Sequence, residues 1–552
     1  MPEEKLLENN ILVGDIPLYG DNPLEEAKQW VKGLNYLPNS LFVVYGIGLG
    51  YEIRELLYRM RPEDKIIIVE PSDDITGWFR DRNPDLQGGK TLHRVKDWGE
   101  FKRLYLYIGD FDSVIPAVLP GYQKVYRKET ERFMVLLGRE ISNLQSDQVT
   151  TDFFHRRWQE NVLRNLRPMT RGGSAAAAIK RYHGAGVLVS AGPSLTSTLP
   201  LLDRVKGKAL IVAVQTANRV FETMDVKPDL IATFDGAFDN YYEHFSGIAL
   251  DVPLVFDPTA YWRCVSEWRG PLSSVLVHPS NRWIETLMEC QFSGFASGPS
   301  IANFLFDLLY EWGADPIILI GQDLAYTGGR FHAKGTHKSE LWDCGIPPER
   351  KLVEVDGVGG GKVVTDRNMV TFLHWYEEML RTKYTNVRAI NATGPDGAEI
   401  HGTVNMPFEE AIQSIQQGNV DEVIRLITTP VASHGIEEFL RSSKNCFIDL
   451  MKDIKRGQQV ATELVYYYAN NRSDEASLDR MLKELSVVDD RITESREYLQ
   501  VVQYMIRPLL CKSEYPIAER GDGLLTARRS MAIYTGLSDT MEAVIPILEE
   551  VS

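Results

Sequence analysis

The chain has 552 residues, of which 44% are hydrophobic and 25% are charged, and its formal net charge is −16. That length exceeds what one hydrophobic core supports, so we expect two to four domains, and the acidic balance argues against sequence-independent binding to nucleic acid. The five cysteines are scattered without a C-x-x-C pair, which disfavours a disulfide framework and a zinc ribbon. The opening MPEEKLLENN has no apolar signal region, and no uncharged apolar run reaches transmembrane length. The sequence therefore predicts a cytoplasmic protein that does not insert into a membrane.

The first third of the chain predicts a Rossmann-type βαβ unit. An apolar strand at 41–45 is followed by a glycine turn at 46–50 and an amphipathic helix at 52–59, and a second strand at 65–69 ends in Glu70. This order resembles the first motif of methyltransferases that bind S-adenosylmethionine, in which the acid holds a ribose. The glycines would equally serve a tight turn with no ligand, because a lone glycine pattern is weak evidence for a nucleotide. We expect no productive binding of S-adenosylmethionine.

Composition predicts three domains. Residues 1–170 form an N-terminal Rossmann-like α/β domain with linker helices, which the breaks at Pro168 and Gly172 bring to an end. Residues 171–405 alternate strand and helix patterns, as in a doubly wound parallel sheet. The predicted strands of this central domain are 187–190, 209–214, 230–233, 254–256, 274–277 and 317–320. Residues 406–552 show long amphipathic helices with almost no strand signal, which predicts an all-helical bundle.

Small and polar residues follow the central strands at the edge where open α/β sheets bind ligands. Two G-P-S turns, at 192–194 and 298–300, precede helices, and their backbone N–H groups suit phosphate oxygens. The amides after the second strand suit a ribose or a base edge. The predicted binding residues are Ala191, Gly192, Pro193, Ser194, Gln215, Thr216, Asn218, Ser297, Gly298, Ser300, Gly321, Asp323 and Asn391, and the predicted catalytic residues are Asp235, Tyr326 and His332. Taken singly, each has a plainer interpretation: the turns as helix N-caps, Asp323 as a loop cap and His332 as an ordinary histidine.

Four segments resemble the motility accessory factor (Maf) proteins, which belong with the 6-hydroxymethylpterin diphosphokinase (MptE-like) proteins. The segments are VLVSAGPSL, LIVAVQTANRVF with KPDLIATFDG, FASGPSIANFLFDLLYEWGADPIILIGQDLAYTGGRFHAKG, and AINATGPDGAEIHG, all within residues 185–405. Maf proteins glycosylate flagellin in the cytoplasm, and their central domain is similar to bacterial sialyltransferases. The resemblance implies an inverting glycosyltransferase that moves a nonulosonic acid from a CMP-sugar to Ser or Thr of flagellin and is needed for flagellum assembly and motility. The implied partners are flagellin and the CMP-sugar, with no metal and no tightly bound cofactor, and a homo-oligomer is compatible with this scheme.

The chain departs from the sialyltransferase pattern at several positions. The asparagine of GNGPSL aligns with Ala191, whereas Gln215 keeps an amide and Asp235 replaces an asparagine after the third strand. The family's catalytic histidine has no counterpart at 361–365. The resemblance therefore leaves His332 and Asp235 as the two candidates for the general base.

Two other functions stay open. One is pyrophosphoryl transfer to a hydroxymethylpterin, which needs ATP and Mg²⁺ held by carboxylates such as Asp235, Asp239 and Asp323. The other is a non-catalytic adaptor that binds flagellin, which the missing asparagine and histidine favour. Binding of CMP separates the adaptor from the enzymes, and added ATP with Mg²⁺ separates the two enzymes.

Overall fold

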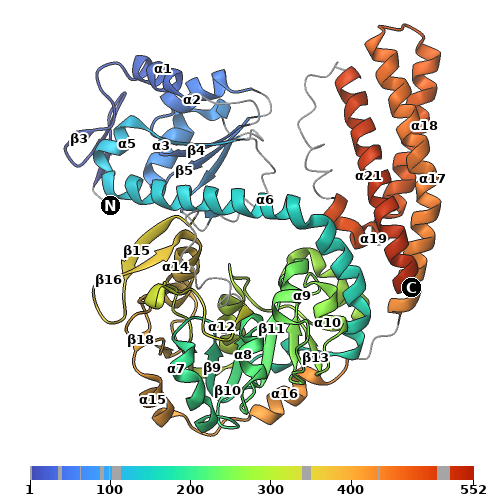
Figure 1. The fold of residues 1–552 in the computed structure, drawn as a ribbon. Coiled ribbons are helices and arrows are strands. Elements are labelled where there is room, and N and C mark those ends of the chain that lie inside the picture. The colour runs from blue at the N-terminus through green and yellow to red at the C-terminus, as the bar shows by residue number, and fades with distance from the viewer. Residues whose placement is uncertain are drawn as a thin grey trace. The chain divides into compact units, whose positions relative to one another are not determined.

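A computed structural model of the chain describes residues 3–34, 40–61, 64–86, 92–97, 100–101, 113–337, 350–431, 435–506 and 523–552, and for residues 92, 139–153, 279 and 525 it describes the backbone alone. Its internal contacts divide the chain into two compact units (Figure 1). The first unit is Met1–Phe153 with Lys452–Arg491 and Ile506–Asp539. The second is Phe154–Met451 with Ile492–Met505 and Thr540–Ser552. The three domains expected from composition stay a prediction.

The second unit is built on a nine-stranded sheet whose strands all pair in parallel, in the order β18-β17-β14-β9-β10-β11-β12-β13-β8. The strands are β8 (Gly173–Ser174), β9 (Gly184–Val189), β10 (Leu210–Val214), β11 (Leu230–Thr233), β12 (Leu254–Phe256), β13 (Leu272–Ser274), β14 (Ala314–Ile320), β17 (Ala389–Asn391) and β18 (Val404–Asn405). The predicted doubly wound α/β fold is confirmed. The predicted strand at 274–277 is misplaced, because β13 pairs with β12 through Leu272 and Ser274.

The strand order contains a switch point beside β9. From β9 the chain steps to β10, β11, β12 and β13 in one direction, and β14 then pairs with the opposite side of β9. Val187 of β9 accordingly lies between Ile211 of β10 and Ile318 of β14. Ligands of open α/β sheets bind at the carboxyl edge beside such a switch point.

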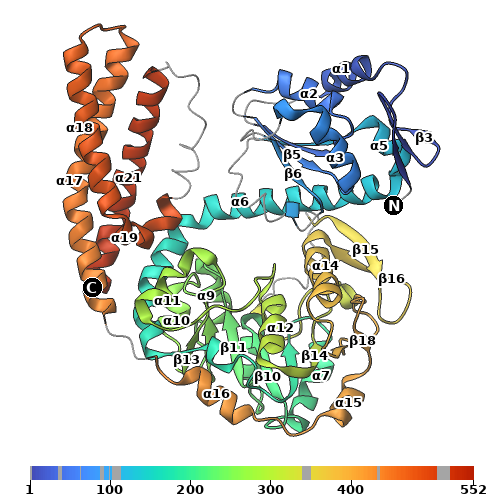
Figure 2. The same ribbon diagram turned by 180° about the vertical axis from the view of Figure 1, so that it is seen from behind.

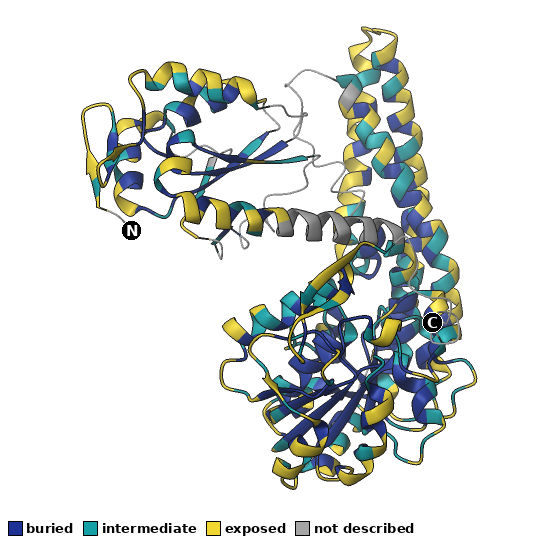
Figure 3. Ribbon diagram, turned by 60° about the vertical axis from the view of Figure 1, so that its left-hand side comes forward, coloured by how far each residue is buried: buried dark blue, intermediate teal, exposed yellow. Residues whose placement is uncertain are grey.

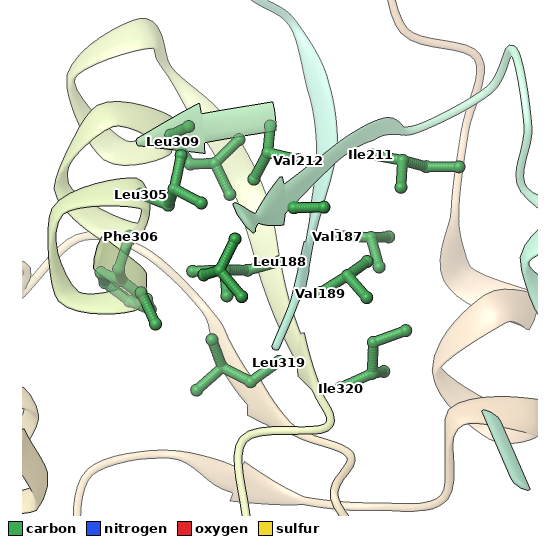
Figure 4. Packing of buried hydrophobic residues seen from close by; sticks show 14 of the residues in the cluster. Val187, Leu188, Val189, Ile211, Val212, Leu305, Phe306, Leu309, Leu319 and Ile320 are labelled. Atoms are coloured by element: carbon green, nitrogen blue, oxygen red, sulfur yellow. The ribbon is translucent and has the colours of Figure 1, made fainter. Parts of the chain in front are cut away.

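The core of this unit lies between the sheet and helix α12 (Ile301–Trp312). Figure 4 shows this packing around β9, and the residues labelled there are Val187, Leu188, Val189, Ile211, Val212, Leu305, Phe306, Leu309, Leu319 and Ile320, all of them 0% exposed. Strands of a parallel sheet covered on both faces read as continuous apolar runs, which explains why these strands were predictable. Figure 3 shows buried residues concentrated in the strands.

Short helices follow most strands of the second unit. They are α7 (Leu195–Thr198), α8 (Asn218–Glu222), α9 (Phe238–His244), α10 (Trp262–Ser266), α11 (Trp283–Met288), α14 (Arg367–Thr382), α15 (Phe408–Ala411) and α16 (Val420–Thr428). A two-stranded antiparallel hairpin, β15 (Leu352–Asp356) with β16 (Lys362–Asp366), precedes α14. Helix α6 (Arg127–Arg171) ends in this unit just before β8.

The first unit contains the predicted Rossmann-like sheet, which is parallel and has the order β6-β5-β4-β7. Its elements are β4 (Ser40–Tyr45), α2 (Tyr51–Arg59), β5 (Lys65–Val69), α3 (Asp73–Arg82), β6 (Leu92–Val95), β7 (Ser113–Val118) and α5 (Pro120–Val125). Helix α1 (Pro23–Gly33) and a small antiparallel sheet of β1 (Glu4–Leu6), β2 (Ile11–Val13) and β3 (Ile16–Pro17) precede it.

The predicted helical C-terminal region is confirmed. Helices α17 (Ile436–Ala469), α18 (Glu475–Glu494) and α21 (Gly523–Val551) lie side by side in Figures 1 and 2, and α19 (Arg496–Leu499) follows α18. Within the first unit, Arg456 of α17 binds both carboxylate oxygens of Glu484 at 2.6 and 3.0 Å. Tyr534 of α21 donates to Asp489 of α18 at 2.6 Å. Among the described residues, none of the helices combines the length and apolar character needed to span a bilayer.

Candidate active site

The loops that follow β9 and β14 are joined at the switch point. Gly192 N–H donates to the carbonyl oxygen of Gly321 at 2.8 Å, and Ser190 N–H donates to that of Ile320 at 2.9 Å. A Cβ on Gly321 would lie 2.1 Å from the Ser190 oxygen, and the backbone there has φ +64°. Glycine is required at this turn because both the space and the left-handed backbone exclude a side chain.

Asp323 fixes the first G-P-S turn from the neighbouring loop. The Asp323 carboxylate is buried and accepts from Ser194 Oγ at 2.7 Å, from Ser194 N–H at 3.2 Å and from Thr327 Oγ1 at 2.9 Å. Burial raises the pKa of Asp323, and the hydrogen bonds from Ser194 oppose that rise. We expected the N–H groups of Gly192 and Ser194 to be free to bind a phosphate. Both instead donate hydrogen bonds within the protein, so these two donors stabilise the loop. Pro193, between them, has no N–H to offer.

The second G-P-S turn begins helix α12. Ser300 is its N-cap, because Oγ accepts from Asn303 N–H at 3.2 Å. Gly298 packs against α12, where a Cβ would lie 2.4 Å from that of Asn303. Just before it, Ala296 N–H donates to buried Asp307 at 2.5 Å. The exposed Ser297 thus stands on a loop that is anchored on both sides.

Two predicted amides after β10 differ in their bonding. Gln215 is 6% exposed, and its buried Oε1 atom has no hydrogen-bond partner in the part of the chain that the structure describes. Asn218 is fully buried, and its Nδ2 donates to the carbonyl oxygen of His244 at 3.0 Å. Asn218 Nδ2 therefore holds the end of α9. Its Oδ1, like Gln215 Oε1, is buried without a hydrogen-bond partner among the described residues, and Gln215 lies beside the half-buried Thr216.

Asp235 lies directly after β11 and is exposed. Its Oδ1 accepts from Ala237 N–H at 2.9 Å, which sets the direction of the carboxylate. The next residue is held from α6, because Asn161 Nδ2 donates to the Gly236 oxygen at 3.2 Å and to the Thr259 oxygen at 2.9 Å. Sequence reasoning missed Asn161, since its helix pattern was assigned to the linker of another domain.

Asn165, one turn further along α6, completes this clamp. Its Nδ2 donates to the carbonyl oxygens of Pro258 at 2.9 Å and Ala260 at 2.8 Å. Two asparagines four residues apart share one face of a helix. The loops after β11 and β12 therefore rest on one face of α6.

Tyr326 is placed in a buried pair with Asp366, which the sequence did not reveal. The tyrosine hydroxyl donates to Asp366 Oδ2 at 2.9 Å, and Arg350 donates to the same oxygen at 3.0 Å. Burial and the adjacent carboxylate raise the pKa of Tyr326 to about 12. This hydroxyl serves the start of α14, where Asp366 is the N-cap, and the catalytic role of Tyr326 stays a prediction.

His332 and Asn391 complete the predicted set. Ala333 N–H donates to the Ala191 oxygen at 2.8 Å, which brings His332, half-buried against Phe331, beside the first loop. Asn391 is the buried last residue of β17, and its Oδ1 accepts from Thr393 Oγ1 at 2.7 Å. Asn391 therefore shapes its own loop. Within the described ranges, no group of three or more His, Cys, Asp or Glu side chains is arranged to hold a metal ion.

The glycine turn of the first unit is filled by the chain's own side chains. Gly48 N–H donates to the Tyr122 hydroxyl at 3.2 Å, Leu49 N–H to the Tyr19 hydroxyl at 2.7 Å, and Ile47 N–H to Glu70 Oε2 at 3.0 Å. These are the amides and the acid that would face a nucleotide in a dinucleotide-binding turn. The geometry therefore supports the tight-turn interpretation.

The second unit is a doubly wound α/β protein. Its candidate site is formed by the loops after β9, β10, β11 and β14, at the carboxyl edge of the sheet beside the switch point. Residues 160–329 match the 6-hydroxymethylpterin diphosphokinase MptE-like family. The whole chain has the fold of a solved Maf glycosyltransferase from Magnetospirillum magneticum AMB-1, with a TM-score of 0.51 and 16% sequence identity over 100% of this chain and 92% of that one. No curated protein matches the chain.

Proposed function

We propose that this protein is an inverting glycosyltransferase that moves a nonulosonic acid from a CMP-sugar to a Ser or Thr hydroxyl of flagellin in the cytoplasm. The match to the MptE-like family and the Maf glycosyltransferase fold support a transferase. The observation that supports the proposal most is that Gln215 and Asp235 follow two adjacent strands, β10 and β11. Gln215 offers a buried acceptor without a partner and Asp235 an exposed, oriented carboxylate.

The proposed reaction forms a bond between the acceptor oxygen and C2 of the sugar, while the bond from C2 to the phosphate oxygen breaks. The electron pair leaves with CMP, and the acceptor proton goes to a base. Asp235 is the proposed base and His332 the alternative, and such a group is worth about 10²–10⁴ in rate. The Ser297 hydroxyl would donate to the departing phosphate, where charge develops. Gln215 Oε1 would accept from a ribose hydroxyl or the cytosine amine.

Pyrophosphoryl transfer is the second candidate, since the matched family carries a diphosphokinase name. That reaction needs carboxylates free to bind Mg²⁺. Asp235 and Asp239 are exposed, but Asp323 is buried and bonded to Ser194 and Thr327. The bonding of Asp323 disfavours this alternative.

Intact-mass analysis of flagellin tests the proposal. Purified protein, flagellin and a CMP-nonulosonate should give flagellin heavier by whole sugar residues, and free CMP. Asp235→Ala is the matched inactive control, because an exposed side chain can be removed without unfolding the domain. A parallel reaction with ATP, Mg²⁺ and hydroxymethylpterin should give no pyrophosphorylated product. Unmodified flagellin in the first reaction, with CMP-sugar left intact, would refute the transferase.

A further inference from the structure

Aromatic side chains form a continuous surface after β11 and β12, which we call the aromatic platform: Phe238, Tyr242, Tyr261 and Trp262. Phe238 and Tyr242 lie one helical turn apart on α9, with ring centroids 4.6 Å apart. Phe238 lies 5.9 Å from Tyr261, which lies 6.0 Å from Trp262. Phe238 is 48% exposed and Tyr242 is 44% exposed. Exposed rings in mutual contact are unusual on a surface that binds nothing.

The platform is held rigid by its surroundings. Arg263 donates to the Tyr242 hydroxyl at 3.2 Å and pairs with Glu267 at 2.7 Å. Arg219 donates to the Tyr242 carbonyl oxygen at 2.9 Å. From α6, Asn161 Oδ1 accepts from Trp262 N–H at 3.3 Å. A preorganised surface loses little conformational entropy when a ligand binds.

The platform adjoins the candidate base. Tyr261 N–H donates to the carbonyl oxygen of Asp235 at 3.0 Å, and Phe238 follows Asp235 by three residues. The platform follows β11 and β12, and β10 lies between β11 and β9 in the sheet. The donor is proposed to bind at the switch point. The platform therefore borders Asp235 on the opposite side, away from the donor.

Charge indicates what kind of ligand the platform takes. The guanidinium of Arg263 is balanced by Glu267, and that of Arg219 serves the carbonyl oxygens of Tyr242 and Glu243. Arg164 lies 4.9 Å from the Trp262 ring and is paired with Glu160 and Glu550, so the accessible part of the platform is the rings of Phe238 and Tyr242. The exposed carboxylates of Asp235 and Asp239 stand beside these rings in the sequence, and their negative charge suits a polypeptide rather than an anionic sugar nucleotide. Tyr, Trp, Phe and Arg are also the residues enriched in protein-binding surfaces.

We propose that the aromatic platform is the acceptor subsite: it binds an apolar or aromatic side chain of the acceptor polypeptide and so presents a neighbouring Ser or Thr hydroxyl to Asp235. The chemical class of its ligand is an uncharged polypeptide segment with an apolar residue close to the hydroxyl. This inference rests on the proposed function.

The test removes the two exposed rings in a Phe238→Ala, Tyr242→Ala variant. Tyr58→Ala is the matched control, since Tyr58 is 88% exposed and lies in the first unit. We expect the double variant to raise KM for flagellin by tenfold or more. Its slow hydrolysis of the CMP-sugar without flagellin should stay at the wild-type rate, as should its stabilisation by CMP. A Phe238→Tyr, Tyr242→Ala variant, which keeps an aromatic ring at position 238, should have a KM for flagellin close to that of the wild type.

Direct binding of flagellin without donor provides a second readout, which is independent of sugar transfer. Weaker binding by the double variant but not by Tyr58→Ala supports the subsite, even if the wild type proves unable to transfer sugar and the proposed function fails. An unchanged KM together with unchanged flagellin affinity would overturn the inference. Loss of CMP-sugar affinity with normal flagellin binding would overturn it too, because the platform would then belong to the donor.

Discussion

Ser194 and Asp323, 129 residues apart in the chain, are joined by two kinds of hydrogen bond, since both the hydroxyl and the N–H of the serine donate to the aspartate. This pair assigns the G-P-S turn a structural role that differs from the expected one. The turn was expected to bind a phosphate through free donors, whereas its donors hold two loops of the sheet edge together. We therefore expect ligand contacts from Gln215 and Asp235, which follow β10 and β11, and from Ser297 on the loop before α12.

Removing the Asp323 carboxylate should destabilise the second unit. Asp323→Ala leaves the hydroxyl and the N–H of the half-buried Ser194 without their acceptor, at a cost of about 1–3 kcal/mol for each unsatisfied group, whereas Thr327 Oγ1 keeps the carbonyl oxygen of Asp396 at 3.2 Å. We expect a total loss of about 2–4 kcal/mol in urea unfolding, given partial rescue by water. Asp235→Ala, which removes an exposed carboxylate, should change stability by less than about 0.5 kcal/mol. Equal losses in the two variants would contradict the assigned roles.

The two candidate bases can be separated by isosteric substitution. Asp235→Asn keeps the shape and the hydrogen bond from Ala237 but cannot take a proton, so turnover should fall about 10²–10⁴-fold, close to the fall in Asp235→Ala. His332→Ala should reduce turnover less. If Asp235→Asn keeps most of its activity while His332→Ala loses it, the histidine is the base. Rates are measured as CMP released at saturating flagellin.

Ligand-induced stabilisation should depend on Gln215. CMP and CTP are expected to raise the melting temperature by mass action, and ATP to do so only weakly. Gln215→Leu should abolish most of the CMP effect. Without ligand, the same variant should melt at or above the wild-type temperature, because it removes a buried oxygen that lacks a partner. A full CMP shift in Gln215→Leu, or a larger shift with ATP in the wild type, would argue against a CMP site here.

The first unit should lose stability as the pH rises. Burial raises the pKa of Glu52 from 4.5 to about 7 and that of Glu70 to about 7, so the folded state binds these protons more tightly than the unfolded chain does. The free energy of unfolding should therefore fall between pH 4.5 and pH 7 and level off above. A tenfold shift in a dissociation constant is worth about 1.4 kcal/mol, so the rise from 4.5 to about 7 makes each glutamate contribute roughly 3 kcal/mol.

Glu52→Gln, which is neutral at every pH, provides the check. Calorimetric melting at pH 5.5, 6.5 and 8 should show a smaller decline for the variant than for the wild type. Glu55→Gln, at a half-buried position of the same helix, is the control substitution. A stability that rises over this range would contradict the assignment.

S-adenosylmethionine should not bind the first unit. The hydroxyls of Tyr19 and Tyr122 and the Glu70 carboxylate already occupy the amides of the glycine turn. Titration calorimetry with micromolar protein should give no heat of binding, and NAD should behave in the same way. Micromolar affinity that disappears in Glu70→Ala would show that the tyrosines move aside for a ligand.

The sequence predicted those elements of the fold that depend on short-range residue patterns. The strands β9, β10, β11 and β14 are continuous apolar runs, and α12 carries both an N-cap at Ser300 and a C-terminal glycine at Gly313, so their positions follow from short-range patterns. Strands of two or three residues, such as β8 and β18, lack such a pattern. They are defined by pairing with distant partners, which no local window contains.

The candidate site was predictable in its location but less so in its bonding. The rule that ligands bind at the carboxyl edge pointed to Gln215 and Asp235, which follow β10 and β11, and to Ser297, which lies on the loop before α12. That these residues bind a ligand stays a prediction. It did not reveal that Tyr326 binds Asp366 or that Asn161 supports the Asp235 loop. Those contacts join segments 40 to 75 residues apart, and several side-chain pairings were equally compatible with the sequence.

The close approach of Gly192 and Gly321 has a consequence for comparing distant sequences. A Cβ on Gly192 would lie 2.5 Å from the Gly321 oxygen and 2.2 Å from Asp323, and one on Gly321 would lie 2.1 Å from the Ser190 oxygen. Because the clashes at both positions include backbone atoms, a change elsewhere in the side chains cannot relieve them. At an identity as low as 16%, most columns of an alignment are ambiguous. Because glycine is required at both positions, an alignment with a distant relative of the same fold should place glycines opposite Gly192 and Gly321.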